Sequence, residues 1–260
     1  MELLVTTDWL ANELGASDLR IVDATKFMPD AGRNPAAEYE AGHIPGAVFM
    51  DLSELTDASN SLENMLPPAE KFASRMQSLG LGDGSRVVLY DDSPLKSAAR
   101  AWWMLTIFGA HEVAILDGGI AKWKAEGRPL ESGKETLRHR HFTVWKDDKD
   151  VRTKADMLAN LHSKDEQVVD ARPADRFSGE TPDPRGETAS GHIPGSTNIP
   201  HSRFFNADGT WKSSDEIKAI FDEAGVDLSK PLVTTCGSGM TAAVVSFAAA
   251  LAGAEKTALY

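Results

Sequence analysis

The sequence predicts an α/β fold made of two tandem domains, each a parallel sheet flanked by helices. Two observations lead to this prediction. Short strings of residues return at a nearly constant offset, and apolar runs alternate with amphipathic stretches inside each copy. The chain has 260 residues, which is enough for two domains of ordinary size.

Three pairs of strings define the repeat, each having one member in either half of the chain. They are IVDA at 21–24 with VVDA at 168–171, GHIPGA at 42–47 with GHIPGS at 191–196, and VVLYDD at 87–92 with LVTTCG at 232–237. We therefore expect domains at residues 1–135 and 150–260, joined by a polar segment. AILD at 114–117 aligns with the final ALY, so the second domain is expected to lack its last segment.

Runs rich in Val, Ile and Leu are typical of strands buried on both faces of a parallel sheet. The expected strands are Arg20–Ala24, Arg86–Asp91, Val113–Leu116, Gln167–Ala171 and Leu232–Thr235. Stretches with helical periodicity and start signals lie between them. The expected helices are Asp8–Leu14 with Thr7 as N-cap, Ala69–Leu79, Ala98–Phe108, Lys154–Leu161 and Asp215–Ala224. The alternation favours a parallel α/β sheet in each domain.

Composition excludes several classes of protein. With 27 Lys and Arg against 39 Asp and Glu, the net charge is −12. Such an acidic chain is expected to bind neither nucleic acid nor an anionic membrane. A single cysteine permits no disulfide within the chain and no cysteine-based metal cluster. The first residues do not form a signal peptide, so we expect a cytoplasmic protein.

The single cysteine, Cys236, lies in the most informative segment of the sequence. An apolar strand leads into Cys-Gly-Ser-Gly, and an Ala- and Val-rich helix leads out to about Leu251. Ligands bind at this edge of open α/β sheets, and glycine amides together with a helix N-terminus attract anions. Such surroundings favour a thiolate and would stabilise a persulfide. An inert buried cysteine is the alternative, and the Gly-Ser-Gly turn favours function over it.

The first copy provides an internal comparison for this cysteine. It has Asp91 where the second copy has Cys236. A carboxylate cannot perform thiolate chemistry, so the first domain is expected to be catalytically silent.

Several segments together resemble the two-domain rhodanese-type sulfurtransferases, most closely the 3-mercaptopyruvate sulfurtransferases. The segments are the two HIPG motifs, AARAWW at 98–103, DGGIAKW at 117–123, DARPADRFSGETPDPRGE at 170–187 and CGSGMTA at 236–242. The resemblance covers essentially the whole chain and implies two rhodanese-like domains. Sister thiosulfate sulfurtransferases carry Arg and Lys inside the cysteine loop, where this chain has Gly237 and Ser238.

The resemblance also implies roles for residues outside the cysteine itself. Arg176 and Arg185 fall at the positions of the substrate-binding arginines, and guanidinium groups bind carboxylates bidentately. Ser238 and His43 match residues that are proposed to form a relay with an aspartate, which we do not assign here. The alternative for His43 is a turn residue of the repeated HIPG motif, with His192 at the silent position.

The backbone of the cysteine loop completes the predicted site. The residues expected to cradle the sulfur are Gly237, Gly239, Met240 and Thr241. Met240 stands where the family usually has valine, a change that leaves the backbone cradle intact.

The resulting hypothesis is a two-step sulfur transfer. Cys236 takes sulfur from 3-mercaptopyruvate, pyruvate leaves, and the persulfide passes sulfur to a thiol, thioredoxin or cyanide, with no metal or organic cofactor. The alternatives are a thiosulfate sulfurtransferase and a non-enzymatic persulfide carrier. A cysteine phosphatase is disfavoured because Ala242 stands where such enzymes need arginine.

Overall fold

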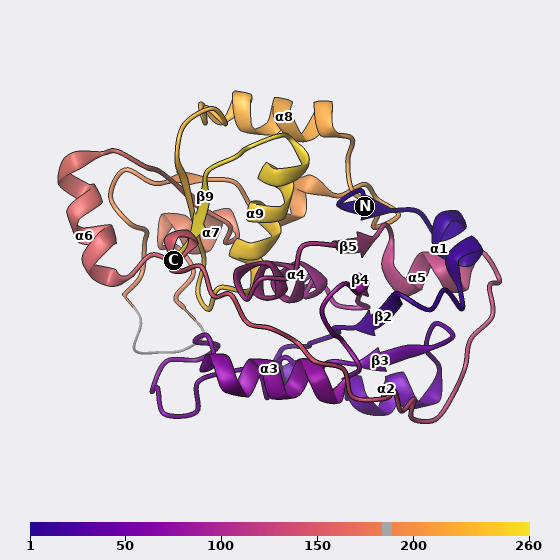
Figure 1. Cartoon of the computed structure of the whole chain (residues 1–260). Coiled ribbons are helices and arrows are strands. Elements are labelled where there is room, and N and C mark those ends of the chain that lie inside the picture. Colours follow the sequence, from indigo (N-terminus) through magenta and orange to yellow (C-terminus); the bar gives the residue numbers. More distant parts are fainter. Residues whose placement is uncertain (184–188) are drawn as a thin grey trace. The chain divides into compact units, whose positions relative to one another are not determined.

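The computed structural model describes residues 1–183 and 189–260, which divide into two compact units (Figure 1). Unit 1 comprises Met1–Asp147 together with Ala207–Trp211, and unit 2 comprises Asp148–Asn206 and Lys212–Tyr260. Each unit has its own sheet and its own buried core. The α/β class predicted from the sequence is therefore confirmed.

The sheet of unit 1 has five parallel strands in the order β1-β5-β4-β2-β3. In chain order these are β1 Leu4–Val5, β2 Leu19–Asp23, β3 Ala47–Phe49, β4 Arg86–Tyr90 and β5 Val113–Leu116. Both β4 and β5 are buried along almost their whole length, as the continuous apolar runs predict.

Four helices connect the strands of unit 1, and a fifth follows β5. They are α1 Thr7–Glu13, α2 Pro35–Ala41, α3 Ala69–Ser78, α4 Ala98–Ile107 and α5 Gly119–Ala125. A short 3₁₀ turn, Pro29–Ala31, precedes α2. The side chain of Thr6 accepts a hydrogen bond from the amide of Trp9. The N-cap of α1 is thus Thr6 rather than Thr7, because its hydroxyl is the one that reaches a free amide of the first turn.

The sheet of unit 2 repeats the same order with four parallel strands, β7-β6-β8-β9. These are β6 Gln167–Asp170, β7 Thr197–Asn198, β8 Leu232–Thr235 and β9 Thr257–Leu259. A single parallel bridge from Val151 to Leu259 stands where β1 pairs with β5 in unit 1. The internal repeat of the sequence is therefore a repeat of structure.

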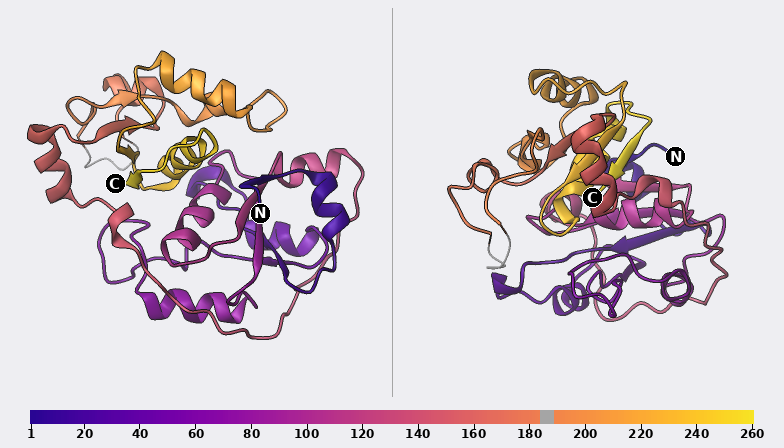
Figure 2. Two further views of the ribbon diagram at one scale, coloured as in Figure 1. Left: turned by 45° about the horizontal axis from the view of Figure 1, so that its top comes forward. Right: turned by 90° about the vertical axis from the view of Figure 1, so that its left-hand side faces the viewer.

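The helices of unit 2 are α6 Lys154–Ser163, α7 Ala174–Ser178, α8 Ser214–Glu223 and α9 Met240–Leu251. Two further 3₁₀ turns cover Asp148–Asp150 and His201–Phe204. Capping boxes begin α6 and α8, formed by Thr153 with Asp156 and by Ser213 with Glu216. Helix α9 packs against β8 and β9, and α8 packs against α9 (Figure 2).

The expected strands all form, each to within one residue of the predicted ends. The elements that the sequence analysis missed are short ones, among them β1, β3, β7, α2, α5 and α7. The missed strands have two or three residues and the missed helices five to seven, so most of them show little periodicity.

The polar segment predicted between the domains belongs to unit 1 up to Asp147. Phe142 is buried, and the amide and hydroxyl of Thr143 both donate to the carboxylate of Asp83. A Cβ added to Gly82 would lie 2.5 Å from the Cβ of Arg140. The absence of a side chain at Gly82 is what lets this segment lie flat against unit 1.

The segment 207–211 also belongs to unit 1, although its neighbours in sequence belong to unit 2. The amide of Trp211 donates to the carboxylate of Asp117 at 2.8 Å, and the amino group of Lys96 donates to the carbonyl of Gly209. These contacts were not visible in the sequence, because they join residues about a hundred positions apart.

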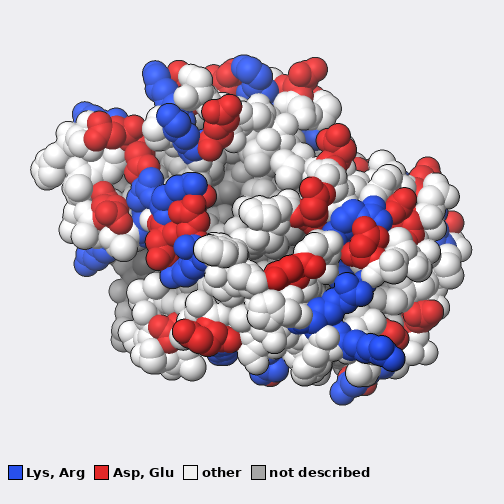
Figure 3. Space-filling view, viewed as in Figure 1, with Lys and Arg blue, Asp and Glu red and all other residues white. Residues whose placement is uncertain are grey.

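The surface carries both signs of charge. On the face drawn in Figure 3, Lys and Arg are interspersed with Asp and Glu, so the net acidity does not gather there in one patch. Within the described ranges, no helix combines the length and the apolar character needed to cross a lipid bilayer.

Candidate active site

Cys236 is the first residue after β8 and lies four positions before the start of α9. It is the single cysteine of the chain, it is free, and it is half-buried. The strand leading to it is fully buried, and Thr235 pairs with Asp170 of β6. Cys236 thus stands at the carboxyl edge of a parallel sheet, where α/β proteins bind their ligands.

The helix that follows Cys236 presents free amides to this edge. Gly239 is the N-cap of α9 and has a left-handed backbone with φ of 71°. No side chain caps this helix end among the residues that the structure describes. Uncapped amides and the positive end of the helix dipole attract an anion. The predicted loop residues Gly237, Ser238 and Thr241 are half-buried beside it.

The helix behind the loop is firmly anchored. Met240 is 4% exposed, and α9 is buried through most of its length. The hydroxyls of Thr234 and Ser246 form a buried hydrogen bond of 2.7 Å between β8 and α9. The strand and the helix that flank Cys236 are therefore fixed to each other, which holds the loop between them in place.

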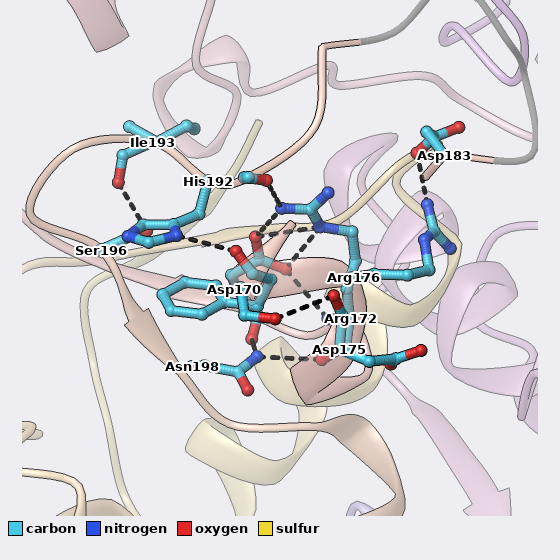
Figure 4. Close-up of polar contacts among 12 residues, drawn as sticks. Asp170, Arg172, Asp175, Arg176, Asp183, His192, Ile193, Ser196 and Asn198 are labelled. Atoms are coloured by element: carbon cyan, nitrogen blue, oxygen red, sulfur yellow. Dashed lines mark hydrogen bonds and ion pairs between the residues drawn. The ribbon is translucent and has the colours of Figure 1, made fainter. Parts of the chain in front are cut away.

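The structure adds a residue to this edge that the sequence analysis did not single out. Arg172 is 9% exposed and is the second residue after β6. Its Nε and Nη2 donate to the two carboxylate oxygens of Asp170 at 2.7–3.0 Å, and Nη2 also donates to the carbonyl of Gly191 (Figure 4). The hydrogen bonds that Arg172 donates to Asp170 raise the pKa of Arg172, and the charges of Asp183 and Cys236 act in the same direction.

A signal for Arg172 was nevertheless present in the sequence. The strings DAT at 23–25 and DAR at 170–172 are equivalent in the repeat and differ in the third residue alone. The copy with the cysteine thus has an arginine where the other copy has a threonine. This substitution places a positive charge at the end of a buried strand, near the candidate site.

Arg176 lies on α7 in the same unit. Its Nη2 donates to the carboxylate of Asp183, whose side chain is 1% exposed (Figure 4). Its Nε is buried and has no hydrogen-bond partner within the described part of the chain. The guanidinium is therefore fixed at one end. Arg185, the other predicted clamp residue, lies outside the described residues.

The equivalent edge of unit 1 shows what Asp91 does in place of the cysteine. Its two carboxylate oxygens accept hydrogen bonds from the amides of Ser93 and Ala98, at 3.0 and 2.7 Å. Ala98 is the first residue of α4, so the carboxylate binds the helix end in unit 1. Burial raises the pKa of Asp91. In unit 1 a carboxylate thus occupies the position equivalent to Cys236 and accepts hydrogen bonds from the amides that follow it.

His43, predicted as a catalytic residue, lies in unit 1 and is 1% exposed. Its ring stacks on Tyr39 with 4.2 Å between centroids, and Nδ1 lies 2.8 Å from the carbonyl oxygen of Tyr39. His192 repeats both contacts in unit 2, with the ring and the carbonyl of Phe177. The repetition favours a structural role for the imidazole in both HIPG turns, and the catalytic role of His43 stays a prediction.

Over residues 1–183 and 189–260, no group of three or more His, Cys, Asp or Glu side chains is arranged to hold a metal ion.

Comparison with known proteins agrees with this arrangement. The model of the rhodanese-like domain matches the chain twice, at residues 6–126 and 153–260. A 3-mercaptopyruvate sulfurtransferase from Mus musculus is 44% identical over 99% of this chain and 89% of the mouse protein. A thiosulfate sulfurtransferase from Cricetulus griseus is 39% identical over the same shares of the two chains.

A solved structure is similar over the whole chain. The crystal structure of SseA from Escherichia coli, described as a 3-mercaptopyruvate sulfotransferase, superposes with a TM-score of 0.92. It is 40% identical in sequence, and the alignment covers 100% of this chain and 98% of SseA. The repeated sheet, the cysteine loop and these similarities lead to one conclusion: this chain belongs to the rhodanese family and contains two rhodanese-like domains.

Proposed function

We propose that this protein is a sulfurtransferase that takes sulfur from 3-mercaptopyruvate and carries it as a persulfide on Cys236. The observation that carries the proposal is the position of Cys236, half-buried between a buried strand and the uncapped N-terminus of α9. This position favours an anionic sulfur over a neutral one.

The reaction has two steps. The Cys236 thiolate attacks the sulfur of 3-mercaptopyruvate, so that an S–S bond forms and the C–S bond breaks. The electron pair of the broken bond stays on the carbon, which takes up a proton, and pyruvate leaves. In the second step an acceptor thiolate or cyanide attacks the outer sulfur, the S–S bond breaks, and the Cys236 thiolate returns. No oxidant and no cofactor enters either step.

The charge distribution around the loop supports 3-mercaptopyruvate as donor. The positions between Cys236 and Met240 hold Gly237, Ser238 and Gly239, so the loop itself contributes no cation. Thiosulfate is a dianion and would gain from cations there, whereas 3-mercaptopyruvate has one carboxylate at a distance from its sulfur. Arg176, fixed by Asp183, is suited to bind that carboxylate. We propose Arg185 as its partner on the basis of the sequence alone.

The relay residues and the sulfur acceptor are predicted from the sequence resemblance. Ser238 lies in the loop two residues after Cys236, and its part in activating the substrate rests on the resemblance. A small thiol, thioredoxin or cyanide is the expected acceptor, and the cytoplasm is the expected compartment.

The test is a pair of steady-state assays with 3-mercaptopyruvate and with thiosulfate, both with cyanide as acceptor. We expect kcat/KM to favour 3-mercaptopyruvate by about a hundredfold, which corresponds to about 2.7 kcal/mol in the transition state. Cys236→Ala should be inactive with both donors. A preference for thiosulfate would contradict the argument from loop charge and support the thiosulfate alternative.

A third measurement separates an enzyme from a persulfide carrier, which has no use for a carboxylate clamp. Arg176→Gln should raise the KM for 3-mercaptopyruvate at least tenfold or so. Arg203→Gln removes an arginine of the same unit that pairs with Glu223 at the surface, and it should leave KM unchanged. Equal KM values for both variants, together with intact sulfur transfer from the Cys236 persulfide to a protein thiol, would favour the carrier.

A further inference from the structure

Arg172 is a buried cation at the edge of the sheet that holds Cys236, and the reaction described above gives it no part. The amide of Ala171 donates to the carbonyl of Thr235 at 2.9 Å. Arg172 and Cys236 are the residues that follow this hydrogen-bonded pair on the two neighbouring strands. The backbone thus brings the arginine next to the cysteine at the carboxyl edge.

Unit 1 shows that a side chain at this position reaches the loop. There the amide of Ala24 donates to the carbonyl of Tyr90 at 2.9 Å, in the same manner as Ala171 and Thr235. Thr25 follows, and its hydroxyl accepts a hydrogen bond from the amide of Asp92, the residue directly after Asp91. The position equivalent to Arg172 therefore contacts the loop equivalent to that of Cys236.

The guanidinium of Arg172 is held rigidly. Its amide, Nε and Nη2 all bind the carboxylate of Asp170, which is itself 2% exposed. Nη1 donates to no residue that the structure describes, so one edge of the guanidinium is left for an anion. The charged groups that act on Arg172 are Asp170, Asp183 and Cys236, and Arg176 is engaged by Asp183.

We propose that Arg172, fixed by Asp170, stabilises the negative sulfur of Cys236 in both its thiolate and its persulfide form. The inference deepens the proposed function, since it assigns the charge that supports the same sulfur. A guanidinium in a buried position exerts its field with little screening by solvent. Unit 1 has Thr25 at this position and no sulfur to support.

The test measures the reactivity of the thiol and needs no sulfur donor. Iodoacetamide alkylation is followed by mass spectrometry from pH 5 to 9, and the single cysteine of the chain gives an unambiguous readout. Arg172→Gln should move the midpoint of the pH profile up by about one unit and slow alkylation at pH 7 by up to about tenfold. Arg172→Lys, which keeps the charge, should restore most of the difference.

A matched control and a second variant keep the result interpretable. Arg152→Gln breaks another two-point pair of unit 2, with Glu166, and should leave the midpoint unchanged. Arg172→Thr copies the residue that unit 1 has beside its buried Asp23, so it offers a folded form should Arg172→Gln not fold. A charge effect moves the midpoint, whereas a distorted loop changes the limiting rate at high pH.

Two results would overturn the proposal. One is a wild-type midpoint in folded Arg172→Gln or Arg172→Thr, and the other is an equal shift in Arg152→Gln. A wild-type enzyme that does not use 3-mercaptopyruvate would contradict the proposed function, and the alkylation profiles would still decide the role of Arg172.

Discussion

Unit 1 and unit 2 have the same sheet order but different ionisable groups at the carboxyl edge. Unit 2 has Cys236 there, with Asp170 paired to Arg172. Unit 1 has Asp91 in place of the cysteine, and its buried Asp23 has no arginine, because Thr25 occupies that position. The position at the helix end thus holds a fixed carboxylate in unit 1 and, as we propose, a reactive sulfur in unit 2.

The comparison indicates that the fold provides the helix end at the carboxyl edge of both sheets, whereas the side chain placed there determines the chemistry. In unit 1 the Asp91 carboxylate receives two amides and closes the site with its own charge. In unit 2 no side chain of the N-cap residue Gly239 caps α9, so we propose that an external anion or a persulfide binds where the Asp91 carboxylate lies in unit 1. Replacing residues in matched pairs, one from each unit, tests this comparison.

The largest effect is expected for the pair at the loop. Cys236→Ala should lower kcat by about a thousandfold or more, because the nucleophile is lost, with little change in stability. Asp91→Ala should leave kcat/KM within about threefold. It should cost unit 1 about 1–3 kcal/mol, because two amides lose their acceptor. Steady-state assays and urea unfolding measure both, and a catalytic defect in Asp91→Ala that exceeds tenfold or so would mean that unit 1 is not silent.

Much of this comparison could be predicted from the sequence. The long apolar runs and the repeated strings give the strands, the order of the copies and the equivalence of Asp91 and Cys236. The ion pairs could not be predicted, since Arg176 with Asp183 is a matter of loop geometry. The place of residues 207–211 in unit 1 depends on contacts such as that of Trp211 with Asp117, between segments far apart in sequence.

The next effect concerns the two buried aspartates. Burial raises the pKa of Asp23 to about 6 from its ordinary value of 3.8. Below about pH 4 Asp23 is protonated in both the folded and the unfolded state, so it does not change the free energy of unfolding. Between about pH 4 and 6 the unfolded state ionises first, so the free energy of unfolding falls with rising pH. Above about pH 6 the loss is complete, at about 3 kcal/mol.

Asp23→Asn should therefore stabilise unit 1 by up to about 3 kcal/mol at pH 7 and have little effect at pH 4. Asp170→Asn should have the opposite sign, costing unit 2 about 3–5 kcal/mol at pH 7, because Arg172 loses a buried counter-charge. All six tryptophans lie in unit 1, so their fluorescence during urea unfolding reports that unit, and far-UV circular dichroism adds unit 2. If Asp23→Asn and Asp170→Asn changed the free energy of unfolding in the same direction, Arg172 would not be what distinguishes the two buried aspartates.

The smallest effect is expected for the two HIPG histidines. His43 and His192 make the same stacking and carbonyl contacts, but they differ in exposure, because the backbone of Glu131 pairs with His43 in both directions at 2.9 Å. His43→Gln should cost unit 1 about 1–3 kcal/mol, and His192→Gln, whose ring is exposed, should cost unit 2 less than about 1 kcal/mol.

The activities of these two variants decide between a structural imidazole and a relay. The described contacts of the His43 ring are all with residues of the HIPG turn and its neighbours, so we expect His43→Gln to keep kcat/KM within about tenfold. A loss of about a hundredfold in a variant whose tryptophan fluorescence shows a folded unit 1, with His192→Gln unaffected, would establish instead the relay that the resemblance implies. The two histidines would then share a fold contact and differ in chemistry, as Asp91 and Cys236 do.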